Sequence, residues 1–410
     1  MKLFHLGDLH IGKTVNGFSM LEDQKYVLEQ LYQLVEQEQP DVVILAGDVF
    51  DRSVPGVEAV AVADALFSRI AIELHTPMIV IAGNHDSNER IGYLSPFAKQ
   101  HQLYLRGVLT AEITPIYLED GDGMVAFYPI PYAKPAVIRE VYADPTISNH
   151  DDGMRAILAG IQAQIQARKN QEAADATLPR MRHVAIAHGH VAKFSATGAE
   201  PLEESRSEKP LEIGGTDVVD AKYFDIFDYT ALGHLHGPQK VGTDHMRYSG
   251  SLLPYSFSEV KQKKGLTIIE LDGTGQVEVT YRPFQLRRKM RILRGALQDL
   301  LEPGQEQAEG HNDYLRVELT DKGAILDPMS KLRSVYPYVM ELARVENQHT
   351  MQKNRVSTLG KVKEQDPLQL VEEFYQYVLG TSCEEDKLAW IQTAMVQVTG
   401  KEDESWKYVD

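Results

Sequence analysis

Residues Lys2–His10 read Lys-Leu-Phe-His-Leu-Gly-Asp-Leu-His, a short apolar run followed by a glycine, a carboxylate and an imidazole. The same order, an apolar run and then a cluster of Asp, Asn or His, recurs at four further points of the chain. The five apolar runs are Lys2–Leu6, Val42–Ala46, Met78–Ala82, Val184–Ala187 and Tyr229–Leu232. Because they are almost continuously apolar, they predict strands that are buried on both faces.

Two stretches between the first three runs have apolar residues at helical spacing, from about Met20 to Glu38 and from Val57 to Leu74. Alternating strands and helices predict an α/β fold, in which right-handed crossovers place helices on the faces of a sheet. Ligands of such sheets bind beyond the carboxyl ends of the strands. All five polar clusters lie at that end.

The second half of the chain changes character. Met154–Ala173 predicts a further helix, and Glu200–Gly215 is polar and turn-rich, as in a long surface loop. Alternating residues from about Lys264 predict a hairpin that closes the first domain. A strand at Tyr314–Leu319 and a helix at Pro328–Val335 predict a small α+β second domain. Two amphipathic helices are expected after it, at Asp366–Leu379 and Glu384–Val398.

Length and composition limit the class of protein. A chain of 410 residues is long enough for two or three domains, and 43% hydrophobic with 25% charged residues is typical of soluble globular proteins. No run of eighteen apolar residues predicts a membrane span, and the N-terminal residues do not resemble a signal peptide. The single cysteine, Cys383, has no intrachain partner. We therefore expect a cytoplasmic protein.

The net charge of −17 argues against a protein that coats nucleic acid, because phosphate binding needs a basic surface. It does not exclude a nuclease, since metal ions supply positive charge at the scissile phosphate. The charge is also uneven. Arg282–Arg294 contains six basic residues and no acidic one, which fits either a solvated strand or a DNA contact.

The polar clusters contain the residue types that bind transition metals. Oxygen and nitrogen ligands without thiolate suit Mn²⁺, Fe²⁺ or Zn²⁺ and suit Ca²⁺ poorly. There are too many candidate ligands for one ion, and two ions that share a carboxylate stabilise both the attacking and the leaving oxygen of a displacement at phosphorus. The candidate ligands are Asp8, His10, Asp48, Asn84, His188, His234 and His236.

Asp48, from the central run, is the best candidate for the shared ligand, and Gly47 before it permits a tight turn. We assign Asp8, His10, Asp48 and His236 to one ion. The second ion receives Asp48, Asn84, His188 and His234. A water molecule held between the ions would be the nucleophile. His85 is beside a ligand without being needed as one, and it could protonate the leaving oxygen or stabilise charge on the phosphate.

Several nearby residues have more than one interpretation. His190, two residues after His188, could replace it as ligand, although contact with a ligand or with substrate is favoured. Asp51 and Arg52 could orient ligands, contact phosphate or only begin a helix. His5 lies inside the first run and is expected to be a packed core residue.

The order Asp-x-His, Gly-Asp, Gly-Asn-His-Asp, a strand-end His and Gly-His-x-His resembles the calcineurin-like metallophosphoesterases. Longer stretches of the sequence resemble the SbcD nucleases in particular. These stretches are Leu45–Arg52, Ile81–Ser87, Ala231–His236 and Arg247–Phe257. The resemblance is strong from Met1 to about Phe284, looser after that, and returns in outline from Asp366. The sequence departs from the family's pattern at His190, where relatives more often have an apolar residue.

This resemblance implies a sandwich with helices on the sheet faces over residues 1–281, a DNA-facing capping domain over 282–360 and a helical partner-binding segment over 361–410. It further implies a homodimer bound to an SbcC-type coiled-coil ATPase in a heterotetramer. Such complexes degrade duplex ends from 3′ to 5′ and open hairpins, with Mn²⁺ as the usual metal, in DNA repair, replication and recombination in the nucleoid. It also favours DNA contact by Arg287, Arg288, Lys289 and Arg291 in the basic stretch.

Three alternatives have different consequences. Another enzyme of the same fold, such as a protein phosphatase or nucleotide phosphodiesterase, would share the ligands but would not need residues 285–410. A binding module that has lost catalysis would lack ligands, whereas every expected ligand and His85 are present. A chain that mainly scaffolds an ATPase would cut DNA only secondarily.

Overall fold

The computed structural model describes residues 1–175, 177–195, 198–208, 218–302, 310–321, 323, 325–345, 387 and 390. The chain forms two compact units, Met1–Ile292 with Glu306–Arg316, and Leu293–Gln305 with the residues from Val317 onward. No helix among the described residues is long and apolar enough to cross a membrane.

The first unit contains two six-stranded sheets. In the first sheet the strand order is β18-β17-β1-β4-β5-β6. The strands β1, β4, β5 and β6 are parallel, and β17 and β18 run antiparallel beside β1. The strands of this sheet are β1 (Lys2–Leu6), β4 (Val42–Ala46), β5 (Met78–Ile81), β6 (Leu103–Arg106), β17 (Gly265–Leu271) and β18 (Val277–Pro283).

The second sheet has the order β15-β16-β14-β9-β8-β7, with β8, β9, β14 and β16 parallel. Its strands are β7 (Ile116–Asp120), β8 (Gly123–Ile130), β9 (Arg182–His188), β14 (Tyr229–Gly233), β15 (Gln239–Val241) and β16 (Thr243–Tyr248). Short two-residue strands form three further pairs: β2 (Thr14–Val15) with β3 (Phe18–Ser19), β10 (Val191–Ala192) with β13 (Val219–Asp220), and β11 (Phe194–Ser195) with β12 (Gly198–Ala199).

The two sheets share one apolar core. Alternate residues of β4 and β5, such as Ile44 and Ile79, pack in one cluster with Phe127 and Ile186 of the second sheet. Because successive side chains of a strand point to opposite faces, the residues between them face the outer helices. The result is a sandwich of two sheets.

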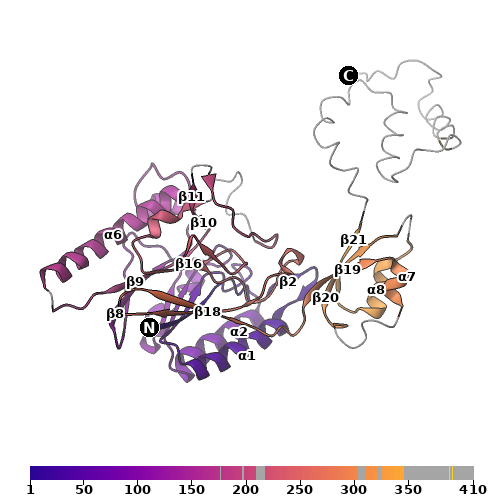
Figure 1. The fold of residues 1–410 in the computed structure, drawn as a ribbon, viewed down its shortest axis with the longest axis horizontal. Helices are drawn as coiled ribbons and strands as arrows, with labels where there is room; N and C mark the ends of the chain where they lie inside the picture. The colour runs from indigo at the N-terminus through magenta and orange to yellow at the C-terminus, as the bar shows by residue number, and fades with distance from the viewer. Residues whose placement is uncertain are drawn as a thin grey trace, which may run out of the picture. The chain divides into compact units, whose positions relative to one another are not determined.

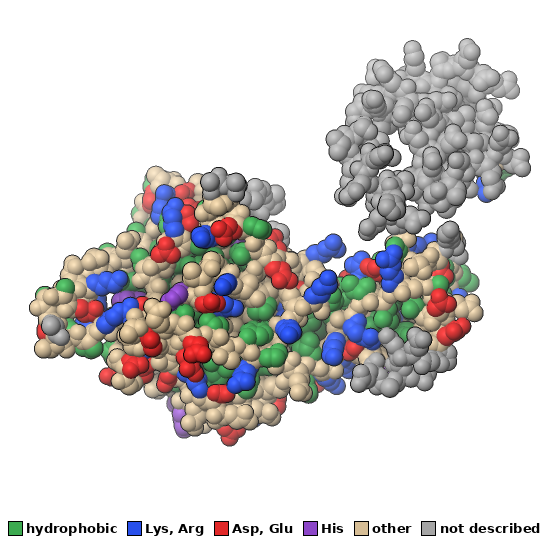
Figure 2. All heavy atoms as spheres, viewed as in Figure 1, with side chains coloured by type: hydrophobic (Ala, Val, Ile, Leu, Met, Phe, Trp, Pro, Cys, Tyr) green, Lys and Arg blue, Asp and Glu red, His purple; other side chains and the backbone are tan. Residues whose placement is uncertain are grey.

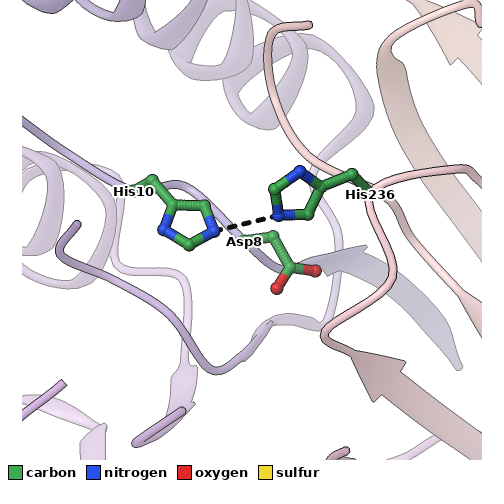
Figure 3. Close-up of side chains that lie close together, drawn as sticks. All are labelled: Asp8, His10 and His236. Carbon is green, nitrogen blue, oxygen red and sulfur yellow. Dashed lines mark hydrogen bonds between the residues drawn. The ribbon is translucent and has the colours of Figure 1, made fainter. Parts of the chain in front are cut away.

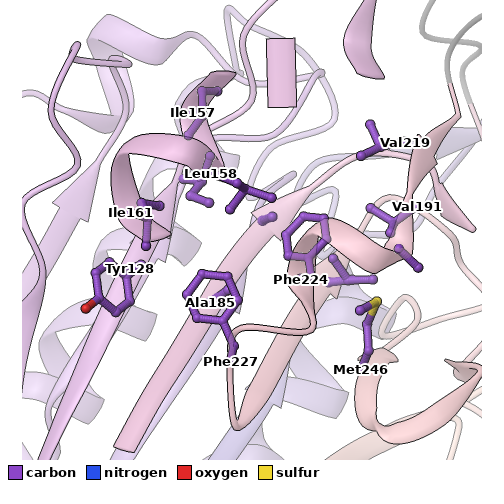
Figure 4. Packing of buried hydrophobic residues seen from close by; sticks show 14 of the residues in the cluster. Tyr128, Ile157, Leu158, Ile161, Ala185, Val191, Val219, Phe224, Phe227 and Met246 are labelled. Atoms are coloured by element: carbon purple, nitrogen blue, oxygen red, sulfur yellow. The ribbon is translucent and has the colours of Figure 1, made fainter. Parts of the chain in front are cut away.

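Helices cover the outer faces, with α1 and α2 on one side and α6 on the other (Figure 1). Ile157 and Ile161 of α6 pack against Tyr128 and Ala185 of the second sheet, as Figure 4 shows. The helices of this unit are α1 (Leu21–Glu38), α2 (Val57–Phe67), η1 (Ser68–Glu73), α3 (Asn88–Ile91), α4 (Ser95–Ala98), η2 (Lys99–His101), α5 (Pro135–Val141), α6 (His150–Ala174), η3 (Ala221–Phe224) and η4 (Phe257–Glu259).

The remaining described elements form a small α+β structure. A three-stranded sheet has the order β19-β20-β21, and the helices α7 and α8 contact each other. These elements are β19 (Met290–Gly295), α7 (Leu297–Leu301), β20 (Tyr314–Leu319), α8 (Pro328–Val335) and β21 (Val339–Arg344).

The predicted α/β sandwich fold is confirmed, and most predicted elements lie within a few residues of the observed ones. The stretch Val57–Leu74, predicted as one helix, is α-helical only to Phe67 and continues as a π-helix to Glu73. The helix expected from Met154 begins at His150, because the Asn149 side chain accepts a hydrogen bond from the backbone N–H of Asp152 and caps it. The predicted helix pair lies outside the described residues, and the division at residues 281 and 360 stays a prediction.

We expect Leu31→Ala to lower the free energy of unfolding of the first unit by about 2–5 kcal/mol, because Leu31 of α1 is fully buried and truncation leaves a cavity. Gln33→Ala, on the exposed face of the same helix, is the control and should change it by less than about 0.5 kcal/mol. Urea denaturation followed by far-ultraviolet circular dichroism measures both. Equal effects of the two substitutions would contradict the assigned packing of α1.

Candidate metal centre

The predicted ligands gather at one edge of the sandwich, where the carboxyl ends of five parallel strands meet. The first sheet contributes the loops after β1, β4 and β5, and the second sheet contributes those after β9 and β14. All seven candidate ligands lie on these loops or at the ends of their strands. They are Asp8, His10, Asp48, Asn84, His188, His234 and His236.

A first group consists of Asp8, His10 and His236, shown in Figure 3. Their ligand atoms lie within 4.8 Å of one another. Nε2 of His10 is 3.1 Å from Nε2 of His236, and the same nitrogen is 3.6 Å from an oxygen of Asp48. This is the set that the sequence assigned to one ion.

A second group surrounds His188. Its Nε2 lies 2.8 Å from Oδ1 of Asn84 and 3.5 Å from Oδ2 of Asp48, and Nδ1 of His234 is 3.2 Å from the same Asn84 oxygen. Asp8, Asp48 and His188 also lie within 4.8 Å of one another. Oδ2 of Asp48 thus faces both His10 and His188, the position that a shared ligand requires.

The backbone at the site is strained. Asp8, His10 and Asp48 have φ angles of 53°, 45° and 51°, and His234 has a φ of 114°. Residues other than glycine rarely adopt such values, and they concentrate at functional sites. Bonds between the first two loops hold this conformation, because the N–H of Asp8 donates to the Gly47 carbonyl at 3.0 Å and the N–H of His10 donates to the Asp48 carbonyl at 2.9 Å.

Two glycines allow the loops to approach one another. Gly47 has a φ of 90°, and a Cβ at this position would collide with the His188 ring. A Cβ at Gly83 would collide with the backbone and carboxylate of Asp48. Glycine is therefore required at both positions for the second group of candidate ligands to meet.

Hydrogen bonds identify the nitrogen that His188 presents to the site. A backbone carbonyl only accepts, so His188 Nδ1–H donates to the carbonyl of Ala46 at 2.9 Å, and Nε2 carries a lone pair. Burial lowers the pKa of His188 to about 4, so the ring is neutral. With the Asn84 amide in this orientation, two acceptor atoms face each other at 2.8 Å. A cation between them removes that repulsion.

The spacing and the donor types fit divalent ions. Two nitrogens bound to one tetrahedral ion at about 2.0–2.1 Å are about 3.3 Å apart, close to the 3.1 Å between His10 and His236. Both groups combine imidazole nitrogen with carboxylate or amide oxygen, the donor set of Mn²⁺, Fe²⁺ and Zn²⁺.

The electrostatics of the site also favour a cation. Burial, followed by repulsion from Asp48, raises the pKa of Asp8, and burial raises the pKa of Asp48 to about 6. Burial lowers the pKa of His10 and His234, and it lowers that of His236 to about 4. The protein thus supplies carboxylates and neutral imidazoles without a matching positive charge, and bound divalent ions would favour the ionised carboxylates.

His85 lies beside this centre. Its ring is 4.6 Å from that of His10, and its backbone N–H donates to Oδ1 of Asp48 at 2.8 Å. Nδ1–H donates to the carbonyl of Asp51 at 2.8 Å, so the lone pair of the neutral ring is on Nε2. His85 also lines a cleft of about 490 Å³, together with Arg52 and Lys134.

The other predicted contact residues have varied surroundings. The Arg52 side chain is 66% exposed, and Arg287 and Lys289 are exposed. Nε2 of His190 is 3.7 Å from a carboxylate oxygen of Glu204, and His190 belongs to neither group.

Two arginines of the basic stretch are held in ion pairs. Arg288 donates to the buried carboxylate of Asp23 at 3.1 Å, and Arg291 donates to Asp313 at 2.8 Å. Both side chains are largely covered, which leaves Arg287 and Lys289 as the more accessible members of the four.

The sequence did not single out several residues that hold the ligand loops. Asp86 accepts from the backbone N–H groups of Val49, Phe50 and Gly83 and so joins two loops. The position of Asp86 directly after His85 was the one signal in the sequence that could have identified it. Gln24 of α1 donates to the carbonyls of Leu9 and His10. No local pattern marks Gln24, because its partners are fixed only by the packing of α1.

Comparison with known proteins agrees with this arrangement. The model of the calcineurin-like phosphoesterase family matches residues 1–238, more than half of the chain. A second family model, described as type 5 capsule protein repressor C-terminal domain, matches residues 286–378. A curated relative, the SbcD subunit of the SbcCD nuclease from Staphylococcus epidermidis, is 34% identical over 376 residues, which cover 92% of this chain and 93% of the relative.

Solved structures with low similarity include a dimetal phosphatase from Danio rerio, with 9% identity and a TM-score of 0.39 over 69% of this chain and 96% of that one. Another is GAP50, the anchor in the inner membrane complex of Plasmodium, with 10% identity and a TM-score of 0.38 over 85% of this chain and 98% of that one. The family assignment rests on the sequence matches, which span both parts of the chain. The chain belongs to the SbcD family of nuclease subunits, within the calcineurin-like phosphoesterases.

Proposed function

We propose that this chain hydrolyses phosphodiester bonds of DNA at a centre of two divalent metal ions. The observation that carries the proposal is the convergence of buried carboxylates and neutral imidazoles, in which Nε2 of His188 lies 2.8 Å from the Asn84 oxygen and Nε2 of His10 lies 3.1 Å from Nε2 of His236. The 34% identity to a nuclease subunit over nearly the whole chain supports DNA as the substrate.

In this proposal Asp8, His10 and His236 hold one ion and Asn84, His188 and His234 hold the other, while Asp48 serves both. When bound, such a pair of ions lowers the pKa of a water molecule and neutralises charge on the phosphate. The residues of the chain fix the positions of the ligand atoms. Asp48 is itself fixed, because its second oxygen accepts the backbone N–H of His85.

His85 is proposed to protonate the leaving oxygen. The hydrogen bond from Nδ1 to the Asp51 carbonyl fixes the ring and leaves Nε2 for the proton transfer. Because His85 lines the cleft and lies against the ring of His10, its Nε2 is available to a substrate held at the centre.

The cleft beside His85 is the proposed entry for a DNA strand. Arg52 and Lys134 on its wall, which also carries Asp51 and Glu89, would supply positive charge for backbone phosphates. Elsewhere on the first unit, acidic and basic side chains are interspersed on the face drawn in Figure 2, without a single basic patch. Arg52 and Lys134 would act as local cations beside the metal ions where the cleft opens. Arg287 and Lys289 are the exposed candidates for further contact.

The finer assignment follows the family. We propose Mn²⁺ as the metal, 3′ to 5′ digestion of duplex ends, cleavage of hairpins and single strands, and a role in DNA repair, replication and recombination. The partner would be an SbcC-type coiled-coil ATPase, bound to a homodimer of this chain in the cytoplasm at the nucleoid. We propose residues 1–281 as the nuclease domain, 282–360 as the capping domain and 361–410 as the partner-binding segment.

A direct test supplies the purified chain with Mn²⁺ and hairpin or single-stranded DNA. We expect weak cleavage that EDTA stops. The contrasting substrates are cyclic nucleotides and phosphopeptides, which a phosphodiesterase or protein phosphatase of the same fold would hydrolyse. If the chain hydrolyses either of these and leaves DNA intact, the nuclease assignment is wrong. Co-purification tests whether a large coiled-coil ATPase binds this chain as its partner.

We expect His85→Ala to lower the rate of DNA cleavage by about 10²–10⁴-fold, the usual contribution of a general acid. The variant should still bind two Mn²⁺ ions, because His85 is not among the proposed ligands. Gel assays give the rate and inductively coupled plasma mass spectrometry gives the metal content. Loss of metal from this variant would make His85 a ligand and contradict its proposed role.

We expect His188→Ala to reduce bound Mn²⁺ from two ions toward one, since His188 places a lone pair beside Asp48 and Asn84. His190→Ala is the matched control, two residues along the same segment, and should keep both ions. Metal content after dialysis distinguishes the two variants. The opposite result, with metal lost only from His190→Ala, would exchange their roles.

A further inference from the structure

A polar network lies behind His236, on the side of its ring opposite to Asp8 and His10. Its centre is Glu259, a fully buried carboxylate that pairs with the equally buried ammonium of Lys264 at 2.6 Å. Ser205 and Ser207, from the stretch that the sequence predicted as a surface loop, both donate hydrogen bonds to Oε1 of Glu259. The network therefore brings together segments that lie more than fifty positions apart in the chain.

The hydrogen bonds fix which nitrogen of His236 carries the proton. Oγ of Ser207 is 2.5 Å from Oε1 of Glu259 and 2.6 Å from Nδ1 of His236. A carboxylate in an ion pair only accepts, so the one proton of the Ser207 hydroxyl goes to Glu259. The oxygen of Ser207 must then accept from His236, which places a hydrogen on Nδ1. The lone pair of the ring is left on Nε2.

That lone pair points to the centre. Nε2 of His236 is 3.1 Å from Nε2 of His10, in the group that includes Asp8 (Figure 3). The backbone of His236 is held as well, because its N–H donates to Glu208 at 2.7 Å and its carbonyl accepts from Lys264 at 2.8 Å. Both the ring and the backbone are thus oriented by the same network.

We propose that Ser207 and Glu259 are positioning residues that fix the tautomer and the ring orientation of His236, so that Nε2 is available to a divalent ion. The proposal rests on the proposed role of His236 as a ligand. It assigns a function to part of the stretch Glu200–Gly215, which the sequence predicted only as a loop. Oxygen acceptors on the second nitrogen of a metal-binding histidine commonly have this effect.

A simpler role for the serines would be to anchor their own segment to Glu259. Ser205 provides the comparison, because its hydroxyl donates to the same Glu259 oxygen at 2.6 Å but is linked to His236 only indirectly, through Ser207, whose backbone N–H it accepts at 3.2 Å. If anchoring is the whole role, removing either hydroxyl should have the same effect. If Ser207 positions His236, only the removal of its hydroxyl should weaken metal binding.

The experiment measures Mn²⁺ binding to the full chain by isothermal titration calorimetry and electron paramagnetic resonance. We expect Ser207→Ala to weaken the binding of one ion by about 10–100-fold, and Ser205→Ala to change it less than about threefold. Ser207→Thr keeps a hydroxyl and should restore most of the affinity. Unchanged binding by Ser207→Ala, or equal loss in both alanine variants, would overturn the proposal.

A second readout examines the tautomer directly. In the metal-free protein labelled with ¹⁵N-histidine, we expect the His236 resonances, assigned by comparison with His236→Ala, to report hydrogen on Nδ1. Hydrogen on Nε2 in the wild-type protein would overturn the proposal. If the wild-type protein binds both ions but does not cleave DNA, the result counts against the proposed nuclease function alone. Unchanged metal binding by His236→Ala would remove the ligand role, and the positioning role with it.

Discussion

The structure depends on the burial of acceptor atoms that have no matching positive charge of their own. The carboxylates of Asp8 and Asp48 are buried at the edge where the two sheets meet, among neutral imidazoles. Two ammonium groups lie nearby, but Lys13 is paired with Asp51 and Lys264 with Glu259. An isolated buried charge is costly, so bound cations would stabilise the ionised carboxylates of this site. This one constraint accounts for the residue types, their burial and their arrangement.

The same constraint explains why the loops have an unfavourable backbone. Side chains reach a common point from five strands only because Asp8, His10 and Asp48 adopt left-handed φ values and Gly47 and Gly83 leave space for His188 and Asp48. Such conformations persist where the surroundings over-determine them. Here the bonds between the first two loops do so, together with the three backbone N–H groups that donate to Asp86. The strained conformation of the loops is therefore what brings the candidate ligand atoms together.

The sequence predicted those parts of the molecule that have a local signal. The strands Lys2–Leu6 and Val42–Ala46 are mostly apolar and agree residue for residue with β1 and β4, and each candidate ligand lies within four residues of the end of such a run. The periodicity could not assign five runs to two separate sheets, because strand order depends on tertiary packing; the family resemblance supplied the sandwich. The periodicity also could not predict contacts between segments that are distant in the sequence. The pair Asp23–Arg288 and the bond from His236 to Ser207 join segments that no periodic pattern relates.

The position of β1 in the first sheet has a consequence for how the protein is made. β1 carries the Asp8 loop and lies between β4 and β17, so its antiparallel neighbour is supplied by residues Gly265–Leu271. The loop that carries His236 is also synthesised long after the loop that carries Asp8. The candidate ligands Asp8, His10, Asp48 and Asn84 precede His188, His234 and His236 by more than a hundred residues, so a nascent chain acquires the two parts of the centre at different stages of its synthesis. The candidate centre can therefore be completed only after β9 and β14 of the second sheet have been synthesised.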